Sequence, residues 1–148
     1  MANFNTWNNY GGLYVEDNST AETTTDATPR KIGAFTTVMP SSSSCTPSAT
    51  TNDITVTDAG DYVIEGTLSF SGTLSKTFEV EIYKDTTASG IKLQRKLGTG
   101  GDVGSASVKG IITLTAGQAV SLYHSSTDGG TAFTLVNGSL TVNKIGWQ

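Results

Sequence analysis

The stretch ITVTDAGDYVIEGTLSF, residues 54–70, decides the fold class of this chain. In its second half apolar and polar side chains alternate, and the apolar set consists of Tyr62, Ile64, Leu68 and Phe70. Because successive side chains of a strand point to opposite faces, this alternation predicts a strand with one buried face. Residues 58–61 (DAGD) are typical of a turn. We therefore expect strands at 54–57 and 61–71 that pair with each other.

The same signature recurs along the chain, whereas no stretch keeps the apolar spacing of a helix. Loops are expected at 40–53 and 98–104, and a hairpin turn at Asn137-Gly138. About eight to ten short strands separated by turns indicate an all-β protein, a single jelly-roll β-sandwich. Besides the opening pair, strands are expected at 31–38, 76–84, 91–97, 106–114, 119–124, 132–136 and 139–145.

The first 30 residues differ from the rest, because aromatic residues alternate there with Asn and Gly before a polar stretch. We interpret residues 1–30 as an extended N-terminal arm and residues 31–148 as the jelly-roll domain. Aromatic side chains are enriched at protein interfaces, so we expect those near the termini to hold a neighbouring subunit. A platform that stacks on sugar rings is the alternative. The expected partner-binding residues are Phe4, Trp7, Tyr10, Leu13 and Tyr14 in the arm, with Trp147 as a terminal anchor.

Composition excludes several classes of partner. A net charge of −4 and a pI near 4.7 disfavour nucleic-acid binding, which needs a dense basic face. No apolar run is long enough for a membrane span, and the N-terminus does not resemble a signal peptide. The single cysteine, Cys45, cannot form an internal disulfide, which favours a reducing cytoplasm. A cytoplasmic origin combined with the Thr, Ser and Gly content of an extracellular β-protein is typical of a virion component.

No catalytic, cofactor or metal residue is expected. The one histidine, His124, is followed by Ser125 and Asp128, but adjacent strand residues point to opposite faces, so we interpret His124 as a surface residue at a strand end. Cys45 has no histidine or basic run near it in sequence to activate its thiol. Asp58 and Asp61 could offer oxygens to calcium, although a turn explains both without an ion. The sequence therefore favours a protein that is not an enzyme.

Four segments point to a family. Strand and turn patterns of tumour-necrosis-factor-like jelly rolls are resembled by ITVTDAGDYVIEGTLSF (54–70), KTFEVEIYKD (76–85), KGIITLTAGQAVSLYH (109–124) and AFTLVNGSLTVNKIG (132–146). The complement-type globular heads share this fold. The resemblance implies a homotrimer with one sheet packed around a threefold axis. Ala59 and Gln118 depart from the family pattern, which often has Pro and Asp there, and no receptor or calcium residue can be carried over.

The arm of Asn, Tyr and Gly is similar to that of small bacteriophage virion proteins with this fold. We therefore expect a capsid decoration (cement) protein on the outer capsid surface of the virion, whose arm clamps the major capsid protein. The alternative is a receptor-binding head-fibre or tail-fibre knob that recognises a host-surface glycan. A free carbohydrate-binding module is a third possibility. Nucleic acid, membrane and cofactors are not expected as partners.

Overall fold

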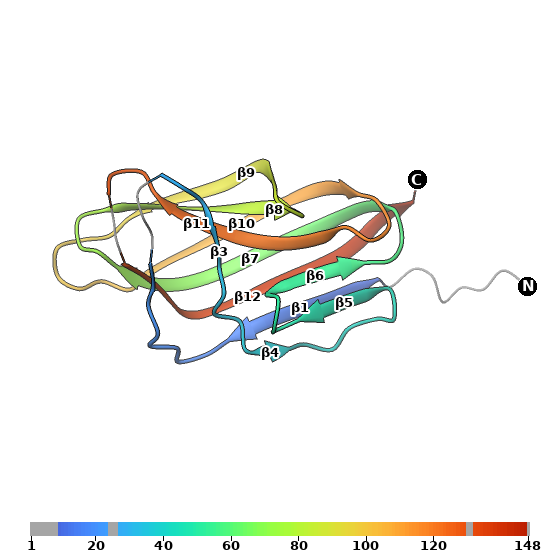
Figure 1. The fold of residues 1–148 in the computed structure, drawn as a ribbon, viewed down its shortest axis with the longest axis horizontal. Coiled ribbons are helices and arrows are strands. Elements are labelled where there is room, and N and C mark those ends of the chain that lie inside the picture. Colours follow the sequence, from blue (N-terminus) through green and yellow to red (C-terminus); the bar gives the residue numbers. More distant parts are fainter. Residues whose placement is uncertain (1–8, 24–26, 130–131, 148) are drawn as a thin grey trace, which may run out of the picture.

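The computed structural model describes residues 9–23, 27–129 and 132–147, and all regular structure in these ranges is β-strand. Two antiparallel sheets lie face to face as a sandwich (Figure 1). Their non-sequential strand orders are those of a jelly roll, so the predicted all-β, single jelly-roll class is confirmed. Within the described ranges no helix is long and apolar enough to cross a membrane.

Each sheet combines strands that lie far apart in the sequence. Sheet 1 has the order β10-β7-β12-β1-β4, and β2 pairs with β12; its strands are β10 (Gly104–Leu114), β7 (Gly60–Gly72), β12 (Ala132–Trp147), β1 (Tyr10–Val15), β4 (Thr37–Val38) and β2 (Glu22–Thr23). Sheet 2 has the order β5-β6-β11-β8-β9, and β3 pairs with β11; its strands are β5 (Cys45–Ser48), β6 (Asp53–Val56), β11 (Ala119–Ser126), β8 (Thr77–Lys84), β9 (Thr87–Lys96) and β3 (Arg30–Lys31).

The apolar residues of the opening stretch lie between the sheets, as the alternation predicted. Tyr62, Ile64 and Phe70 are fully buried, and Leu68 is 3% exposed. At one end of the sandwich the ring of Phe70 lies 5.1 Å from that of Phe133 and 6.0 Å from that of Phe78, measured between centroids. Burying each ring contributes on the order of 1.5–3 kcal/mol, so this trio is a main attachment between the sheets.

The two halves of the opening stretch do not pair with each other, contrary to expectation. β6 belongs to sheet 2 and β7 to sheet 1, so the residues between them carry the chain across the core. The Tyr62 hydroxyl donates to the Asp58 carbonyl oxygen at 2.7 Å and fixes this crossing. Gly60 has a φ of 154°, and a Cβ there would collide with the carbonyl oxygen of Gly146. The turn between β10 and β11 likewise joins different sheets.

The hairpin expected at Asn137-Gly138 is also wrong, because β12 is one strand that runs through these residues. It follows β7 along nearly its whole length, with a bulge between Leu135 and Asn137. The bulge explains why the buried positions change from odd numbers (Phe133 and Leu135) to even numbers (Leu140 and Val142). A Cβ on Gly138 would approach the Thr67 carbonyl oxygen to 2.8 Å, so glycine serves close strand packing here.

The boundary expected at residue 30 does not divide the structure. β1 lies between β12 and β4 inside sheet 1, and its Leu13 and Val15 are buried in the core. The strand expected at 31–38 is instead two short strands, β3 and β4, that belong to different sheets, and the loop expected at 40–53 contains β5. Residues 1–8 of the predicted arm lie outside the described residues.

Candidate interaction surface

The outward face of sheet 1 carries an apolar row that stays exposed among the residues that the structure describes. The strand register places Tyr10, Asn143, Val63 and Ile111 directly opposite one another across four neighbouring strands. Tyr10 is 40% exposed and Ile111 is 62% exposed, and Ile145, in the bulge near the end of β12, is 56% exposed. A row across four neighbouring strands that exposes apolar side chains at both ends is a feature of protein contact surfaces.

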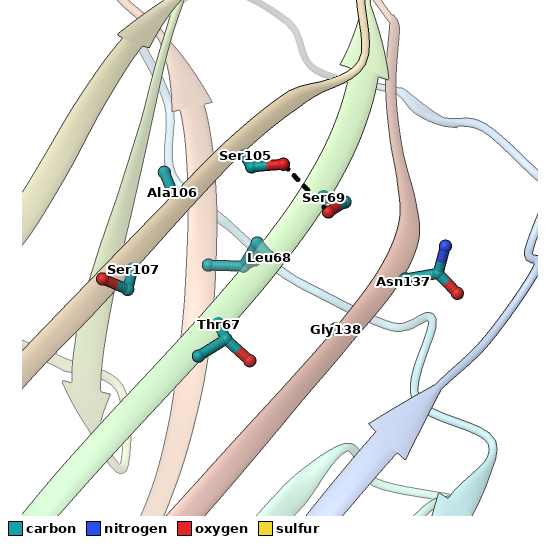
Figure 2. A pocket seen from close by; sticks show the side chains of 8 residues that line it. All are labelled: Thr67, Leu68, Ser69, Ser105, Ala106, Ser107, Asn137 and Gly138. Carbon is teal, nitrogen blue, oxygen red and sulfur yellow. Dashed lines mark hydrogen bonds between the residues drawn. The ribbon is translucent and has the colours of Figure 1, made fainter.

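Further along the same strands the face becomes a shallow hollow lined by small polar side chains (Figure 2). Its lining comes from β7, β10 and β12 and consists of Thr67, Leu68, Ser69, Ser105, Ala106, Ser107, Asn137 and Gly138. The hydroxyls of Ser69 and Ser105 lie 3.1 Å apart, and those of Thr67 and Ser139 lie 2.7 Å apart. These pairs satisfy each other across the strands, so the surface can lose its water at low cost.

Among the described residues of this face charges are few, and they are paired or hydrogen-bonded. Lys109 lies 3.2 Å from Glu65, and Asp61 accepts a hydrogen bond from the Thr113 hydroxyl at 2.6 Å. Contact surfaces are depleted of charge at their centres because desolvating an unpaired charge is expensive. The outward face of sheet 1 therefore has the composition of a surface that can be buried.

The outward face of sheet 2 has the opposite character. Glu79 accepts hydrogen bonds from Lys92 at 3.0 Å and Gln94 at 2.9 Å, and Lys31 pairs with Asp53 at 2.8 Å. Burial alone would raise the pKa of Glu79, but the hydrogen bonds from Gln94 and Lys92 outweigh it and lower that pKa below its ordinary range. Such a charged network suits contact with water rather than with a partner.

The residues expected to bind a partner fall in different places. Tyr10 and Tyr14 alternate with the core residues of β1 and lie on the outward face of sheet 1. Leu13 is fully buried in the core, so its expected role as a contact residue is wrong. The expected contacts Phe4 and Trp7 lie outside the described residues. For the expected anchor Trp147, only the backbone is described, and it pairs with Gly60.

Val63, Ile111 and Ile145 were missed by the sequence interpretation. Val63 and Ile111 are apolar residues beside core residues, for example Ile111 beside Ile112, which is 9% exposed, whereas Ile145 lies between Lys144 and Gly146. The core can bury only one face of a strand, so a strand with apolar side chains on both faces leaves some of them exposed. That local break in the alternation was the available signal.

His124 is buried rather than at the surface as expected. Its side chain is fully covered, its ring stacks on Phe133 at 4.3 Å between centroids, and its Nε2 atom lies 3.2 Å from a Glu22 carboxylate oxygen. The Asp128 carboxylate instead accepts a hydrogen bond from the backbone N–H of Thr77 at 2.8 Å. The contacts described for His124 are therefore those of a packed core residue, and Glu22, 102 positions away, is a partner that no local motif indicates.

The other candidate chemical groups also have structural partners. Cys45 is 2% exposed, and burial raises the pKa of its thiol, which disfavours the reactive thiolate. Asp58 accepts a hydrogen bond from the Asn9 side chain. Among the described residues no group of three or more His, Cys, Asp or Glu side chains is arranged to hold a metal ion.

Solved structures share this arrangement over almost the whole chain. Eiger TNF from S. frugiperda superposes with a TM-score of 0.61 at 12% identity and covers 95% of each chain. Murine APRIL superposes with a TM-score of 0.59 at 14% identity, over 93% of this chain and 99% of that one. The fold is the tumour-necrosis-factor-like jelly roll. The globular domain of zebrafish complement 1qA has the same jelly roll, with a TM-score of 0.59 at 11% identity, over 93% of this chain and 97% of that one. No family model matches the sequence, and no curated protein matches it.

Proposed function

We propose that this jelly roll is a non-enzymatic virion structural protein that assembles through the outward face of sheet 1. Its role is that of a capsid decoration protein on the outer surface of a bacteriophage head, where it binds the major capsid protein. The observation that carries the proposal is the contrast between the two outward faces. The outward face of sheet 1 has an exposed apolar row beside hydroxyls that hydrogen-bond to one another, whereas the outward face of sheet 2 is charged. The virion and the capsid protein rest on the composition of the sequence.

The first contact of the proposed surface is with other copies of the same chain. The threefold arrangement implied by the family resemblance packs one sheet around the axis, and sheet 1 is the sheet with an apolar outward face. Full burial of an isoleucine is worth about 1.5–3 kcal/mol, and each of three copies would bury Ile111. The proposed assembly is therefore a homotrimer held by Ile111, Val63 and Tyr10.

The second contact is with the shell and uses the sequence that precedes β1. Phe4 and Trp7 come shortly before Tyr10, which lies on the same outward face of sheet 1. Three copies of this segment in one trimer would act together, which raises the overall affinity well above that of a single contact. The clamp therefore requires both the trimer and residues 1–8.

Light scattering of the purified protein tests the trimer. We expect three times the chain mass of 15.4 kDa for the unmodified protein and a single chain mass for Ile111→Asp, which would bury an unpaired charge in each contact. Leu74→Asp is the matched control because Leu74 is 46% exposed in the loop between β7 and β8, and it should stay trimeric. A monomeric unmodified protein, or a trimeric Ile111→Asp variant, would contradict the proposed assembly surface.

Cosedimentation with empty heads of the source phage tests the shell contact. The variant to use lacks residues 1–8, because a larger deletion that removed β1 would take Leu13 and Val15 from the core. We expect this variant to remain trimeric and to lose binding to the heads. Unchanged binding would refute the clamp.

The receptor-binding knob is the second candidate, and the hydroxyl-lined hollow in Figure 2 favours it. Serine, threonine and asparagine side chains offer the donors and acceptors that recognise sugar hydroxyls. Binding of the purified protein to host cells, with no binding to empty heads, would put this function first.

A further inference from the structure

A buried polar cluster joins β1 and β12, which are neighbours in sheet 1 and lie near the two ends of the sequence. Asn9 immediately precedes β1 and is 4% exposed, and Lys144 lies near the end of β12 and is 9% exposed. The backbone N–H of Lys144 donates to the Asn9 carbonyl oxygen at 2.8 Å, so the two residues are directly opposite. Neither side chain takes part in the proposed assembly surface, and a buried lysine amine requires a specific explanation.

Both side chains point into the sandwich. Their neighbours Tyr10 and Asn143 pair with each other and lie on the outward face, and alternation places Asn9 and Lys144 on the inward one. Directly opposite residues of antiparallel strands have Cβ atoms about 4.5–5.5 Å apart. The four methylene groups of a lysine cover that separation easily, so the amine of Lys144 can reach the carboxamide of Asn9.

The two side chains also converge on the same crossing segment. The Asn9 amide nitrogen donates to the Asp58 carboxylate at 2.7 Å. The Lys144 amine is 3.3 Å from the point that a Cβ on Gly60 would occupy and 5.8 Å from the centre of the Tyr62 ring. Gly60 follows Asp58 by two residues, so the Lys144 amine and the Asn9 carboxamide both lie near the segment between β6 and β7 that carries the Asp58 carboxylate. The glycine leaves the space that the lysine stem occupies.

An amine, a carboxamide and a carboxylate are the groups that an acyl transfer from an amide to an amine requires. Burial lowers the pKa of Lys144, although Asp58 and Cys45 act in the opposite direction, so the neutral and nucleophilic amine is more accessible than in water. The Asp58 carboxylate is hydrogen-bonded to the nitrogen of Asn9 that would leave in an acyl transfer. A base placed there can take a proton from the attacking amine and give it to the leaving nitrogen.

We propose that Lys144 and Asn9 form an intramolecular isopeptide bond, with Asp58 as the proton carrier. The Lys144 amine attacks the Asn9 carboxamide carbon, and a bond forms between Nζ and Cγ. The bond between Cγ and Nδ2 breaks. One proton passes from Nζ through the Asp58 carboxylate to Nδ2, and ammonia leaves. The reaction needs no oxidant or cofactor, since an amine and a primary amide become a secondary amide and ammonia.

The bond would tie β1 covalently to β12 through their side chains. These strands lie side by side in sheet 1 but at opposite ends of the described sequence. The terminal strands could then no longer separate from each other, which closes the sandwich against unravelling from either end.

Intact-mass spectrometry of the full chain tests the proposal directly. We expect the purified protein to be lighter than its encoded sequence by one ammonia molecule, under denaturing conditions that remove non-covalent contacts. Lys144→Arg keeps the positive charge but cannot form the amide, and it should have the full encoded mass. Asp58→Asn, which removes the proton carrier, should also have the full mass. A full encoded mass for the unmodified protein would overturn the proposal.

Tryptic mapping assigns the lost ammonia, because Asn137-Gly138 could also lose ammonia by forming a succinimide. An isopeptide bond blocks cleavage after Lys144 and joins the peptide 1–30 to the peptide 110–148 as one branched product. We expect this branched product in the unmodified protein and its absence in Lys144→Arg. Loss of ammonia with residues 1–30 recovered as a separate linear peptide would refute the bond. Loss of ammonia in Asp58→Asn would refute the role of Asp58.

Discussion

Phe133 is the side chain whose truncation should destabilise the sandwich most clearly. It is fully buried, and its ring lies 5.1 Å from that of Phe70, 5.9 Å from that of Phe78 and 4.3 Å from that of His124. Phe133→Ala removes a ring that contacts both sheets and uncovers one face of a buried imidazole. Replacing a buried Phe by Ala costs about 3–5 kcal/mol from lost burial and the residual cavity. The four-ring packing places this site near the middle of that range, so we expect a loss of about 4 kcal/mol.

Urea denaturation followed by fluorescence measures this loss as a change in the free energy of unfolding. All variants must be compared at one protein concentration, because assembly makes apparent stability concentration-dependent. Phe133→Leu should lose less, because it fills part of the space and still folds if the alanine variant does not. Val38→Ala is the control: Val38 is 47% exposed on β4, and the change should stay within about 0.5 kcal/mol. A loss below about 1.5 kcal/mol for Phe133→Ala would refute the assigned role of the ring cluster.

Two other outcomes follow from the buried and paired ionisable groups. The folded state lowers the pKa of Glu79, so its stabilisation is present above the ordinary glutamate pKa and is lost as the pH falls through the lowered value. At neutral pH the free energy of unfolding of Glu79→Gln should therefore be lower than that of the unmodified protein by less than about 1 kcal/mol, and this difference should vanish in acid. A difference that grows in acid would contradict the pairing of Glu79. The Cys45 thiol should react with a maleimide at least about a hundredfold more slowly in the native protein than in urea, and comparable rates would show that it is not buried.

The sequence predicted which face of β7 is buried, but not which strands are its neighbours. The period-two pattern of Tyr62, Ile64, Leu68 and Phe70 is a local consequence of pleating, and so it could be read directly. Residues 58–61 suit a hairpin turn and a crossing between sheets equally well. That choice depends on whether β7 gains more by pairing with β6 or with β10 and β12, which are distant in sequence.

The candidate site was predictable only in part for the same reason. Tyr10 and Tyr14 were recognised as aromatic residues in a polar segment, whereas Leu13 between them lies in the core because β1 inserts beside β12. Sequence numbering cannot show that Glu22 lies next to His124, or that Asn9 lies opposite Lys144. Contacts of that kind exist only once the sheets have assembled.

The position of β12 in the middle of sheet 1 has a consequence for the order of folding. β12 is the last strand in sequence, and both β1 and β7 pair with it. During synthesis, β1 and one edge of β7 therefore remain unpaired until β12 has been made, when almost the entire described chain has left the ribosome. Long-range antiparallel pairing is slow, and unpaired strand edges can join other chains in the meantime. The Thr- and Ser-rich outward side of β7 keeps its unpaired edge hydrated. We therefore expect β12 to pair with a monomeric chain that has not aggregated.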